Sequence, residues 1–348
     1  MNKTMTETLL DKETADTVRL SVEDAQTLGE TALAKLGFTQ EEARMVVTHL
    51  IDATVWGYEF AGLPRILVIA DRPELKKPRN PVSIVRETPV SALLDGGNHV
   101  GYVSIPRAVD VAIDKVRQSG VAIVGLRNSW FAGRNGYYLE RIARAGYVAV
   151  YFGSSTPSVV PPGASKKILG TNPLAIALPG RVNPFIFDMG TGTVMTGEIL
   201  LKAFLGEEFS EIVGINGEGV PTRSARELKE GGVFPFGGHK GYGVSLAVQA
   251  LGLLAGSRFR NGQVSDFGSL LIAFDPELLM PLEQFTTELE ELLTKVKTLP
   301  KQPGVVEIRI PSERGFKERE IRRQQGVLVN KHVVQRLHDI CGTSVPLK

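Results

Sequence analysis

The closely spaced β-rich runs between residues 121 and 190 constrain the fold of this chain most. Apolar runs at 121–126, 147–153, 174–180 and 184–190 are separated by Gly, Pro and Ser, and one helical pattern, at 136–145, lies among them. Parallel strands need a long crossover between them, usually a helix. Strands this close therefore predict a sheet that is not a parallel βαβ array. No Gly-x-Gly-x-x-Gly follows a first strand with an acid about twenty residues later, so a Rossmann domain is not supported.

Helical patterns precede the β-rich region. Ser21 begins one helical pattern, which ends at Gly37. Thr39 and Glu42 form the capping-box pattern of a second helix, which extends to about Val55. These two segments predict a helical lobe at the N-terminal side of the sheet.

The remaining segments complete an α/β (α+β) fold with helical N- and C-terminal segments in a second lobe. We predict a loop at 57–66, short strands at 82–94 ending in an Asp-Gly-Gly-Asn turn, helices at 105–119, 241–256 and 282–297, strands at 268–274 and 305–310, and two polar helices at the end. The predicted divisions are a flexible arm (1–18), a helical substrate lobe (19–120), a β-rich cofactor domain (121–300) and a C-terminal segment (301–348) that returns to the first lobe.

Composition excludes several classes of function. The 348 residues include 40 Lys and Arg against 38 Asp and Glu, so no net field favours nucleic acid or an acidic membrane. No apolar run approaches the length of a membrane span, and the first twenty residues lack the apolar core of a signal peptide. The single cysteine, Cys341, suits a reducing cytoplasm. The five histidines lack metal-ligand spacing, so we expect no metal.

Four glycine-rich stretches carry the candidate chemistry. They are NSWFAGRNGYY (128–138), LGTNP (169–173), FDMGTG (187–192) and PFGGHKGYG (235–243). Glycine turns expose backbone N–H groups and let phosphates approach closely. The last stretch adds a cation and opens a helix, whose N-terminus favours anions. Together the four stretches predict a nucleotide site.

Individual polar residues in these stretches have two interpretations each. Asp188 ends an apolar strand, where it either caps the turn or orients a catalytic group or cofactor. Lys240 is either a surface lysine or a contact for phosphate or carboxylate. Arg65 is either a charge at a helix end or a bidentate clamp for a substrate carboxylate.

The order of the motifs resembles a known family. LGTNP, Asp-Met-Gly-Thr, GGHKGYG and a late IPSER followed by RRQQG are similar to the malate/L-lactate dehydrogenase superfamily of non-Rossmann oxidoreductases. The resemblance runs from about Ser21 to the C-terminus. It implies a largely antiparallel cofactor domain, NAD or NADP as cofactor, and hydride transfer to small 2-oxo acids or cyclic imines. It also implies a homodimer with active sites near the subunit interface.

The resemblance also implies the site residues. It places cofactor contacts at Pro184, Phe185, Ile186, Phe187, Asp188, Met189, Gly190, His239, Lys240, Ser312, Glu313 and Arg314. The substrate side falls on Ala61, Arg65, Phe131, Tyr137, Thr171 and Asn172. Asp188 and His239 are the candidate catalytic residues.

The chain departs from the family pattern at its usual acid. Alignment without gaps puts Ala61 where the family carries its catalytic histidine, and Phe131 where it commonly carries another histidine. Reduction of a carbonyl needs a proton, and alanine cannot supply one. The reaction has therefore changed, for example to an already protonated cyclic imine, or another residue has taken over, or the protein is a cofactor-binding pseudoenzyme or a structural, non-catalytic partner protein. Candidates for the second case are His239, Tyr137 and Tyr58, and His239 could equally stack on the cofactor.

Overall fold

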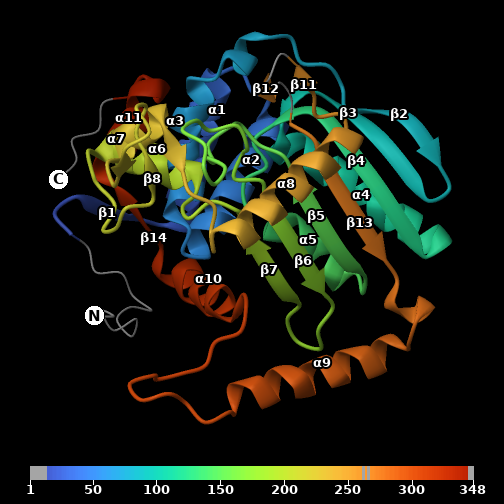
Figure 1. The fold of residues 1–348 in the computed structure, drawn as a ribbon. Coiled ribbons are helices and arrows are strands. Elements are labelled where there is room, and N and C mark those ends of the chain that lie inside the picture. The colour runs from blue at the N-terminus through green and yellow to red at the C-terminus, as the bar shows by residue number, and fades with distance from the viewer. Residues whose placement is uncertain (1–13, 261–262, 265–266, 344–348) are drawn as a thin grey trace. The chain divides into compact units, whose positions relative to one another are not determined.

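The chain forms two compact units. A computed structural model describes residues 14–260, 263–264 and 267–343 (Figure 1). Unit 1 comprises Met1–Leu75 and Glu283–Lys348, and unit 2 comprises Lys76–Leu282. The strands and helix between residues 83 and 119 belong with the large sheet in unit 2, so these compact units divide the chain differently from the predicted divisions at residues 18, 120 and 300, which stay predictions. None of the helices in the described part of the chain is long and apolar enough to cross a membrane.

Unit 1 is mainly helical. Its elements are β1 (Thr17–Leu20), α1 (Val22–Lys35), α2 (Gln40–Val55), η1 (Glu59–Ala61), α3 (Pro64–Ala70), α9 (Leu282–Lys297), α10 (Glu313–Gln325), β14 (Val327–Asn330) and α11 (Lys331–Cys341). The two predicted N-terminal helices are confirmed: Ser21 caps α1, and Thr39 and Glu42 form the capping box of α2. Strands β1 and β14 pair antiparallel, and α1 packs against α2 and α11.

Trp56, at the end of α2, joins two helices of unit 1. Its ring is almost fully buried and packs against Phe316 of α10, with ring centroids 4.7 Å apart. Gly315 lies so close to this ring that an added Cβ would stand 1.9 Å from a ring carbon. The contact between α2 and α10 therefore requires glycine at position 315.

Unit 2 is built on one large mixed sheet. The seven strands lie in the order β2-β3-β4-β13-β5-β6-β7. Their bounds are β2 (Ser83–Thr88), β3 (Ser91–Val100), β4 (Val121–Trp130), β13 (Ser269–Phe274), β5 (Val148–Gly153), β6 (Leu174–Leu178) and β7 (Phe185–Met189). Only β3 and β4 pair parallel in this sheet, and the helix α4 (Gly101–Ser119) connects them. The prediction of closely spaced, largely antiparallel strands is confirmed.

Helices cover the two faces of the large sheet unequally. Helices α4 and α5 (Asn135–Arg144) pack on one face, and α8 (His239–Leu254) packs on β5 and β13 (Figure 1). Helix α8 lies on the other face of the sheet (Figure 1). A Cβ built on Gly125 of β4 would point to that face and lie 3.4 Å from Ala255, the residue just after α8. Helices α5 and α8 were both predicted, but the predicted starts were one residue and two residues later than the observed ones.

A smaller lobe extends from the end of β7. It contains α6 (Thr196–Leu205), α7 (Ala225–Glu230) and the strands β8 (Gly214–Ile215), β9 (Pro221–Thr222) and β10 (Gly232–Val233). Its own core gathers Val159, Leu169, Ile199, Phe209, Leu228 and Val233. Short elements complete the chain: η2 (Pro73–Lys76), β11 (Phe259–Arg260), β12 (Gln263–Val264) and η3 (Pro276–Leu278).

Two predictions near the N-terminus need correction. Residues 14–18 of the predicted arm are described, and Thr17 already belongs to β1; residues 1–13 lie outside the described part of the chain. The predicted loop at 57–66 contains η1 and the start of α3 at Pro64. Proline at a first helical position is favourable, because its fixed φ suits the helix and its missing N–H is not needed there.

Two strand predictions were also wrong in detail. The Asp-Gly-Gly-Asn sequence at 95–98 does not end a strand, because β3 continues through it to Val100 with an irregular register. Asp95 accepts hydrogen bonds from Gly97 N and Asn128 Nδ2, which holds the irregularity inside the strand. The strand predicted at 305–310 is absent among the described residues: this segment is mostly exposed and pairs with no strand.

Replacing Gly315 with alanine should destabilise unit 1. The added methyl group would overlap the Trp56 ring, and a rigid ring can yield only if α10 shifts. Overpacking of this kind costs about 1–3 kcal/mol. We expect a melting temperature lower by several degrees in calorimetry. The control is Gly217→Ala, whose Cβ would meet its nearest neighbour at an ordinary 3.5 Å; equal melting temperatures for both variants would contradict the prediction.

Candidate active site

Asp188 ties the end of β7 to the start of α5. Its carboxylate accepts hydrogen bonds from Gly136 N at 2.7 Å and from Asn135 Nδ2 at 3.3 Å. A Cβ added to Gly136 would stand 2.8 Å from Arg134 Nη1, so the guanidinium would have to shift to make room for it. Carboxylates are favourable at helix N-termini, where backbone N–H groups lack partners. The cap interpretation and the orienting interpretation of Asp188 are therefore compatible.

The electrostatics of Asp188 combine opposing effects. Burial raises the pKa of this carboxyl group, whereas the Gly136 hydrogen bond and the nearby Arg134 guanidinium lower it, and the net shift is upward. Arg134 and Asn135 are themselves buried polar residues. The stretch 128–138 therefore contains a buried guanidinium and a buried amide beside a carboxylate, although it has no acid of its own.

Asn172, in the LGTNP stretch, is completely buried and makes hydrogen bonds in several directions. Its Oδ1 accepts from Ser155 N at 3.1 Å. Its Nδ2 donates to Ser245 O at 3.0 Å and to Gln249 Oε1 at 3.2 Å, both in α8. The amide therefore holds three segments together and is not exposed to a ligand.

The three remaining glycine-rich stretches meet at Thr171 and Thr191. Thr191 N, in FDMGTG, donates to the carbonyl oxygen of Thr171 at 2.7 Å. Phe236 N, in PFGGHKGYG, donates to the carbonyl oxygen of Thr191 at 3.0 Å. Gly192 also forms an isolated bridge with Pro235. Stretches more than sixty residues apart thus form one hydrogen-bonded cluster, which we call the glycine cluster.

The first turn of α8, which follows the glycine cluster in the chain, is open to solvent. Gly237 and Gly238 both have positive φ, and a Cβ built on either would meet nothing within 4 Å. His239 and Lys240 follow as the exposed first residues of the helix. Free backbone N–H groups and a cation on an open turn are the features that bind anions.

The aromatic residues of the 128–138 stretch pack among themselves. Phe131 has φ of +56° and contacts the rings of Trp130 and Phe267 edge-on. Tyr137, in α5, contacts Tyr138 in the same way and stays partly exposed. Phe131 therefore belongs to an apolar corner between β4 and α5.

In unit 1, the predicted substrate residues lie on η1 and α3. Ala61 ends η1, and Arg65 is the second residue of α3; both are partly exposed. Gly62 between them is indispensable, because a Cβ there would stand 2.0 Å from Thr54 Oγ1 in α2. The Ala61–Arg65 turn is thus pressed against α2, with both predicted residues on its open side.

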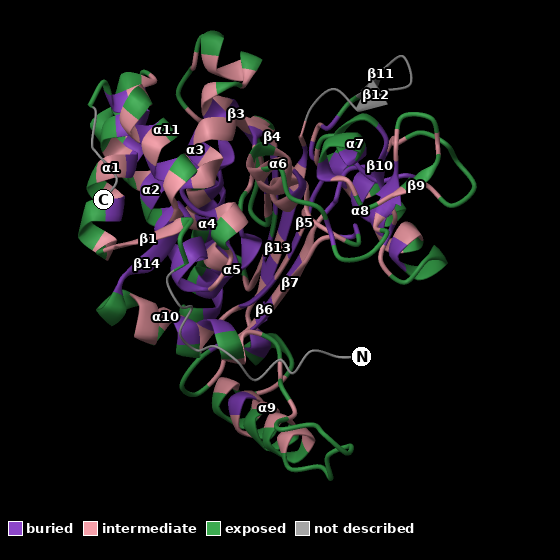
Figure 2. Ribbon diagram, turned by 90° about the vertical axis from the view of Figure 1, so that its left-hand side faces the viewer, coloured by how far each residue is buried: buried purple, intermediate pink, exposed green. Residues whose placement is uncertain are grey.

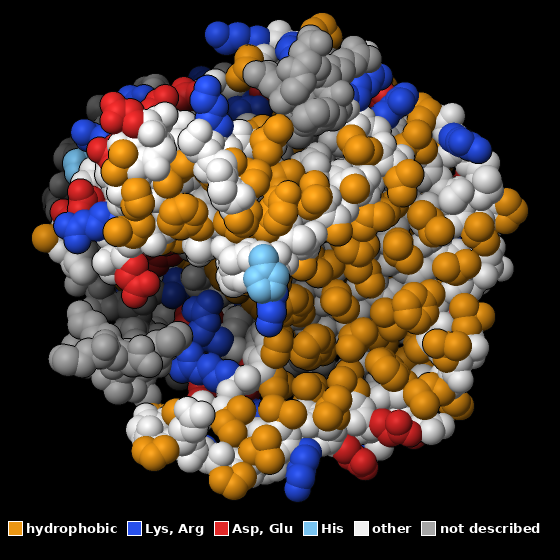
Figure 3. Space-filling view, in the orientation of Figure 1, with side chains coloured by type: hydrophobic (Ala, Val, Ile, Leu, Met, Phe, Trp, Pro, Cys, Tyr) orange, Lys and Arg blue, Asp and Glu red, His pale blue; other side chains and the backbone are white. Residues whose placement is uncertain are grey.

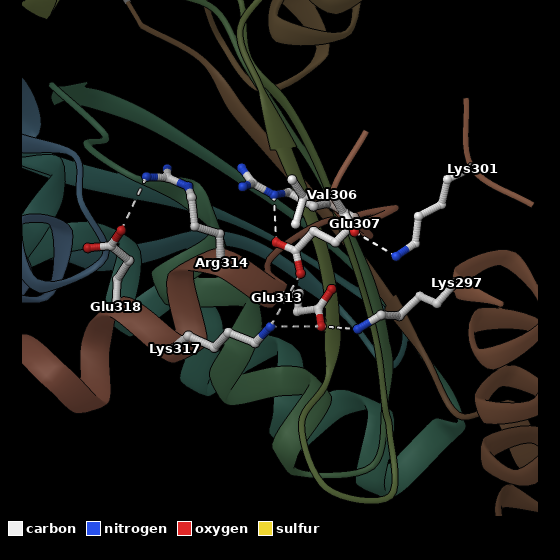
Figure 4. Close-up of polar contacts among 9 residues, drawn as sticks. Lys297, Lys301, Val306, Glu307, Glu313, Arg314, Lys317 and Glu318 are labelled. Atoms are coloured by element: carbon white, nitrogen blue, oxygen red, sulfur yellow. Dashed lines mark hydrogen bonds and ion pairs between the residues drawn. The ribbon is translucent and has the colours of Figure 1, made fainter. Parts of the chain in front are cut away.

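The predicted segment Ser312–Arg314 begins α10 in the same unit. Figure 4 shows Glu313 between Lys297 and Lys317, to both of which its carboxylate is bound. Burial raises the pKa of Glu313, but the hydrogen bonds from these two lysines outweigh it and lower the value. Arg314 lies 3.9 Å from Glu318 and stacks over the ring of Tyr58 at 5.5 Å. Because Tyr58 precedes η1, unit 1 brings the Ser312 segment to the Ala61 loop.

The predicted residues therefore fall into two groups. In unit 2, Asp188 of β7 faces α5, whereas Thr171 and the turn after β7 join the segment that leads into α8. Unit 1 brings together the Ala61 loop and the start of α10. Sequence reasoning missed Ser155, Ser245 and Gln249 around Asn172, because single hydroxyl and amide residues carry no local pattern. It also missed Arg134 and Asn135, although both lie in a stretch it singled out. Across the described residues, no cluster of His, Cys, Asp and Glu could hold a metal ion.

Comparison with known proteins decides the family. Residues 20–338 match the model of the malate/L-lactate dehydrogenase family. The chain belongs to this family. It is 36% identical to a malate dehydrogenase of Pyrococcus abyssi, over 88% of this chain and 90% of that protein. It is 32% identical to an L-sulfolactate dehydrogenase of Methanocaldococcus jannaschii, over 89% and 92%.

The fold agrees with solved structures of the malate/L-lactate dehydrogenase family. Malate dehydrogenase from Pyrococcus horikoshii superposes with a TM-score of 0.84 at 28% identity, covering 97% of this chain and 99% of that one. The resemblance read from LGTNP and GGHKGYG is confirmed, and the protein is an oxidoreductase of the dehydrogenase and reductase type.

Removing the Asn172 amide should destabilise unit 2. In Asn172→Ala, Ser155 N, Ser245 O and Gln249 Oε1 lose their hydrogen bonds to the amide inside the protein. Unsatisfied buried groups cost about 1–3 kcal/mol each. We expect urea unfolding to show a loss of roughly 3 kcal/mol. The exposed Asn183→Ala should stay within about 0.5 kcal/mol, and a loss for Asn172→Ala no larger than this would refute the role.

Proposed function

We propose that this malate/L-lactate dehydrogenase family member binds NAD(H) or NADP(H) on unit 2 and transfers a hydride to or from a small 2-oxo or 2-hydroxy acid or a cyclic imine. The observation that carries the proposal is the glycine cluster with the uncovered first turn of α8. Open glycine turns with a cation beside them suit a pyrophosphate, and they do so without a Rossmann fingerprint. The proposed cofactor domain is therefore non-Rossmann and coincides with the mixed sheet of unit 2.

Three groups of residues have proposed roles in binding the cofactor. Lys240 would pair with a phosphate, and the strand residues Pro184 to Gly190 would line the nucleotide. Ser312, Glu313 and Arg314 are assigned to the cofactor by family resemblance. Because Glu313 is bound to Lys297 and Lys317, we assign it a supporting part in holding the start of α10.

The proposed substrate contacts centre on Arg65. A guanidinium on the first turn of α3 can bind a carboxylate through two parallel hydrogen bonds. The 2-oxo and 2-hydroxy acids carry such a group, and so does a cyclic imine that has a carboxylate substituent. Ala61 beside it leaves space for the substrate, and its methyl side chain cannot donate a proton. Phe131 and Tyr137 would contribute apolar and aromatic surface, and Thr171 would contribute a backbone that positions the FDMGTG turn.

When bound, the nicotinamide ring would supply or accept the hydride, and the chain must handle the proton. His239 is the proposed proton-transfer residue, because it is exposed at the open end of α8 beside the proposed phosphate contact. Asp188 is proposed to orient the start of α5, since its carboxylate already accepts hydrogen bonds from Asn135 and Gly136 there. A positioned acid or base contributes about 10² to 10⁴ in rate.

Cofactor binding tests the proposal directly. We expect NADH or NADPH to bind in fluorescence titration, and Lys240→Ala to weaken this binding about tenfold, the size of one charge-assisted contact of about 1.4 kcal/mol. Reduced nicotinamide mononucleotide lacks the distal phosphate, so its binding should hardly change. The exposed Lys295→Ala is the matched control. If Lys240→Ala affects both ligands equally, Lys240 lies away from the distal phosphate.

A second experiment concerns the proton. His239→Gln should lower kcat by about 10² or more on the best substrate from a screen of 2-oxo acids and cyclic imines, with cofactor affinity within a few-fold. Unchanged kcat would move the role to Tyr137 or Tyr58, and a collapse of affinity would favour stacking on the cofactor. Activity on 2-oxo acids that appears only in Ala61→His would support the pseudoenzyme alternative.

We further propose a homodimer in a reducing cytoplasm. The homodimer is implied by the family resemblance, and the single cysteine fits a reducing compartment. Sedimentation of the pure protein at micromolar concentration tests the first point. A monomer that turns over substrate would refute it.

A further inference from the structure

Helix α10 has both buried and exposed residues along its length (Figure 2), and Figure 3 shows Lys and Arg side chains gathered over the region that this helix occupies in Figure 1. Among these cations the helix buries one carboxylate, that of Glu318, whose side chain is 4% exposed. Its Oε2 accepts a hydrogen bond from Arg322 Nε at 2.7 Å. Its Oε1 lies 3.9 Å from Arg314 Nη1 (Figure 4).

The stability of α10 does not require this burial. An ion pair spaced i,i+4 stabilises a helix at its surface, as the more exposed pair of Glu313 and Lys317 does on the same helix. Burying a carboxylate beside its partners adds little net stability, because the group first has to leave water. A buried ion pair does fix the geometry of the groups around it, so the role of Glu318 has to be sought in what its two arginines contact.

The Ala61 loop, residues 57–63 between α2 and α3, lies directly against this ion pair. Gly57 has φ of +82°, and a Cβ added to it would stand 3.0 Å from Arg314 Nη1 and 3.7 Å from Glu318 Cδ. The backbone at the start of the loop therefore covers part of the carboxylate.

The two arginines of Glu318 reach two consecutive residues of the Ala61 loop. The guanidinium of Arg314 lies over the ring of Tyr58, at 5.5 Å from the ring centroid. Arg322 Nη1 lies 4.0 Å from Glu59 Oε1. Charges of opposite sign thus alternate from Glu59 through Arg322 and Glu318 to Arg314, which returns to the loop at Tyr58. Glu318 is the central member of this chain of contacts.

Tyr58 and Glu59 in turn carry the backbone hydrogen bonds of the loop. Ala61 N donates to Tyr58 O at 3.0 Å, and Gly62 N donates to Glu59 O at 3.0 Å. The next turn follows at once, because Arg65 N donates to Gly62 O at 2.9 Å. The position of Arg65 therefore depends on the two residues that the arginines of α10 contact.

We propose that Glu318 is a positioning residue for the substrate: through Arg314 and Arg322 it holds the Ala61 loop and thereby places Arg65. The inference rests on the proposed function for the contact between Arg65 and a substrate carboxylate. Such a contact has to be placed to within about 0.5 Å. Free arginine side chains have many rotamers, and a shared carboxylate restricts both guanidinium groups at once.

Hydrogen exchange of the full-length chain tests the loop without any ligand. Glu318→Gln keeps the shape of the side chain and removes its charge. We expect the amides of Ala61, Gly62 and Arg65 to exchange about tenfold faster or more, whereas the amides of α1 exchange as in wild-type protein, because the opening is local. The matched control is Glu320→Gln, which removes the same charge from an exposed position of α10 and should leave the exchange of the loop unchanged.

Steady-state kinetics separates positioning from general stability. On L-malate, or on the best acid or imine of the screen, Glu318→Gln should raise KM about tenfold or more with kcat nearly unchanged. A carboxylate contact that is equally strong in the ground state and the transition state affects KM alone. Binding of NADH or NADPH in fluorescence titration should stay within a few-fold of wild-type protein.

Two outcomes would overturn the inference. One is wild-type exchange at residues 61–65 in a folded Glu318→Gln variant. The other is an unchanged KM, and a loss of cofactor affinity beside it would place the action of Glu318 on the cofactor. Wild-type protein that binds no cofactor and turns over none of the screened compounds refutes the proposed function, and exchange still decides whether Glu318 holds the loop.

A second variant decides the case if Glu318→Gln does not fold. Glu59 is 54% exposed, so Glu59→Gln leaves the core intact while it removes the carboxylate that Arg322 contacts on the loop. Faster exchange of Ala61, Gly62 and Arg65 in this variant supports the inference, and unchanged exchange overturns it.

Discussion

The side-chain amide of Asn172 must satisfy its hydrogen bonds inside the protein, because no solvent reaches it. It does so with Ser155 after β5 and with two residues of α8, and this choice fixes where α8 lies on the sheet. The backbone of its neighbour Thr171 then holds the turn after β7. The helix that carries the open first turn of α8 is therefore fixed to the sheet by the buried hydrogen bonds of Asn172. A binding site at a helix end requires such a rigid support.

The sequence made the broad architecture predictable wherever a local rule governs the chain. Caps at Ser21 and Thr39 and the closely spaced apolar runs depend on neighbours in sequence, and those elements were found. The prediction of a strand at 305–310 was wrong, because alternating apolar and polar residues do not by themselves supply a neighbouring strand to pair with. The prediction of a turn at 95–98 was wrong, because a hydrogen bond between Asp95 of β3 and Asn128 of β4 stabilises an irregularity within the strand. The local sequence alone is typical of a turn.

The candidate site was predictable in its motifs and less so in its roles. The glycine-rich stretches could be singled out, since glycine is needed where another part of the backbone approaches closely, as at Gly170 and Gly241. Asn172 was expected on the substrate side, yet its amide is an internal tie. That difference depends on Ser155, Ser245 and Gln249, which are distant in sequence and become visible only once the sheet has formed.

The two tryptophans of the chain are divided between the two units. Trp56 in unit 1 contacts the ring of Phe316, and the guanidinium of Arg319 lies over both rings. Trp130 in unit 2 donates its indole N–H to the carbonyl oxygen of Asn98. Each unit therefore carries one intrinsic fluorophore in its own environment. With either tryptophan replaced by phenylalanine, the remaining emission would report on one unit alone, so the order in which the units unfold or respond to a ligand can be read optically.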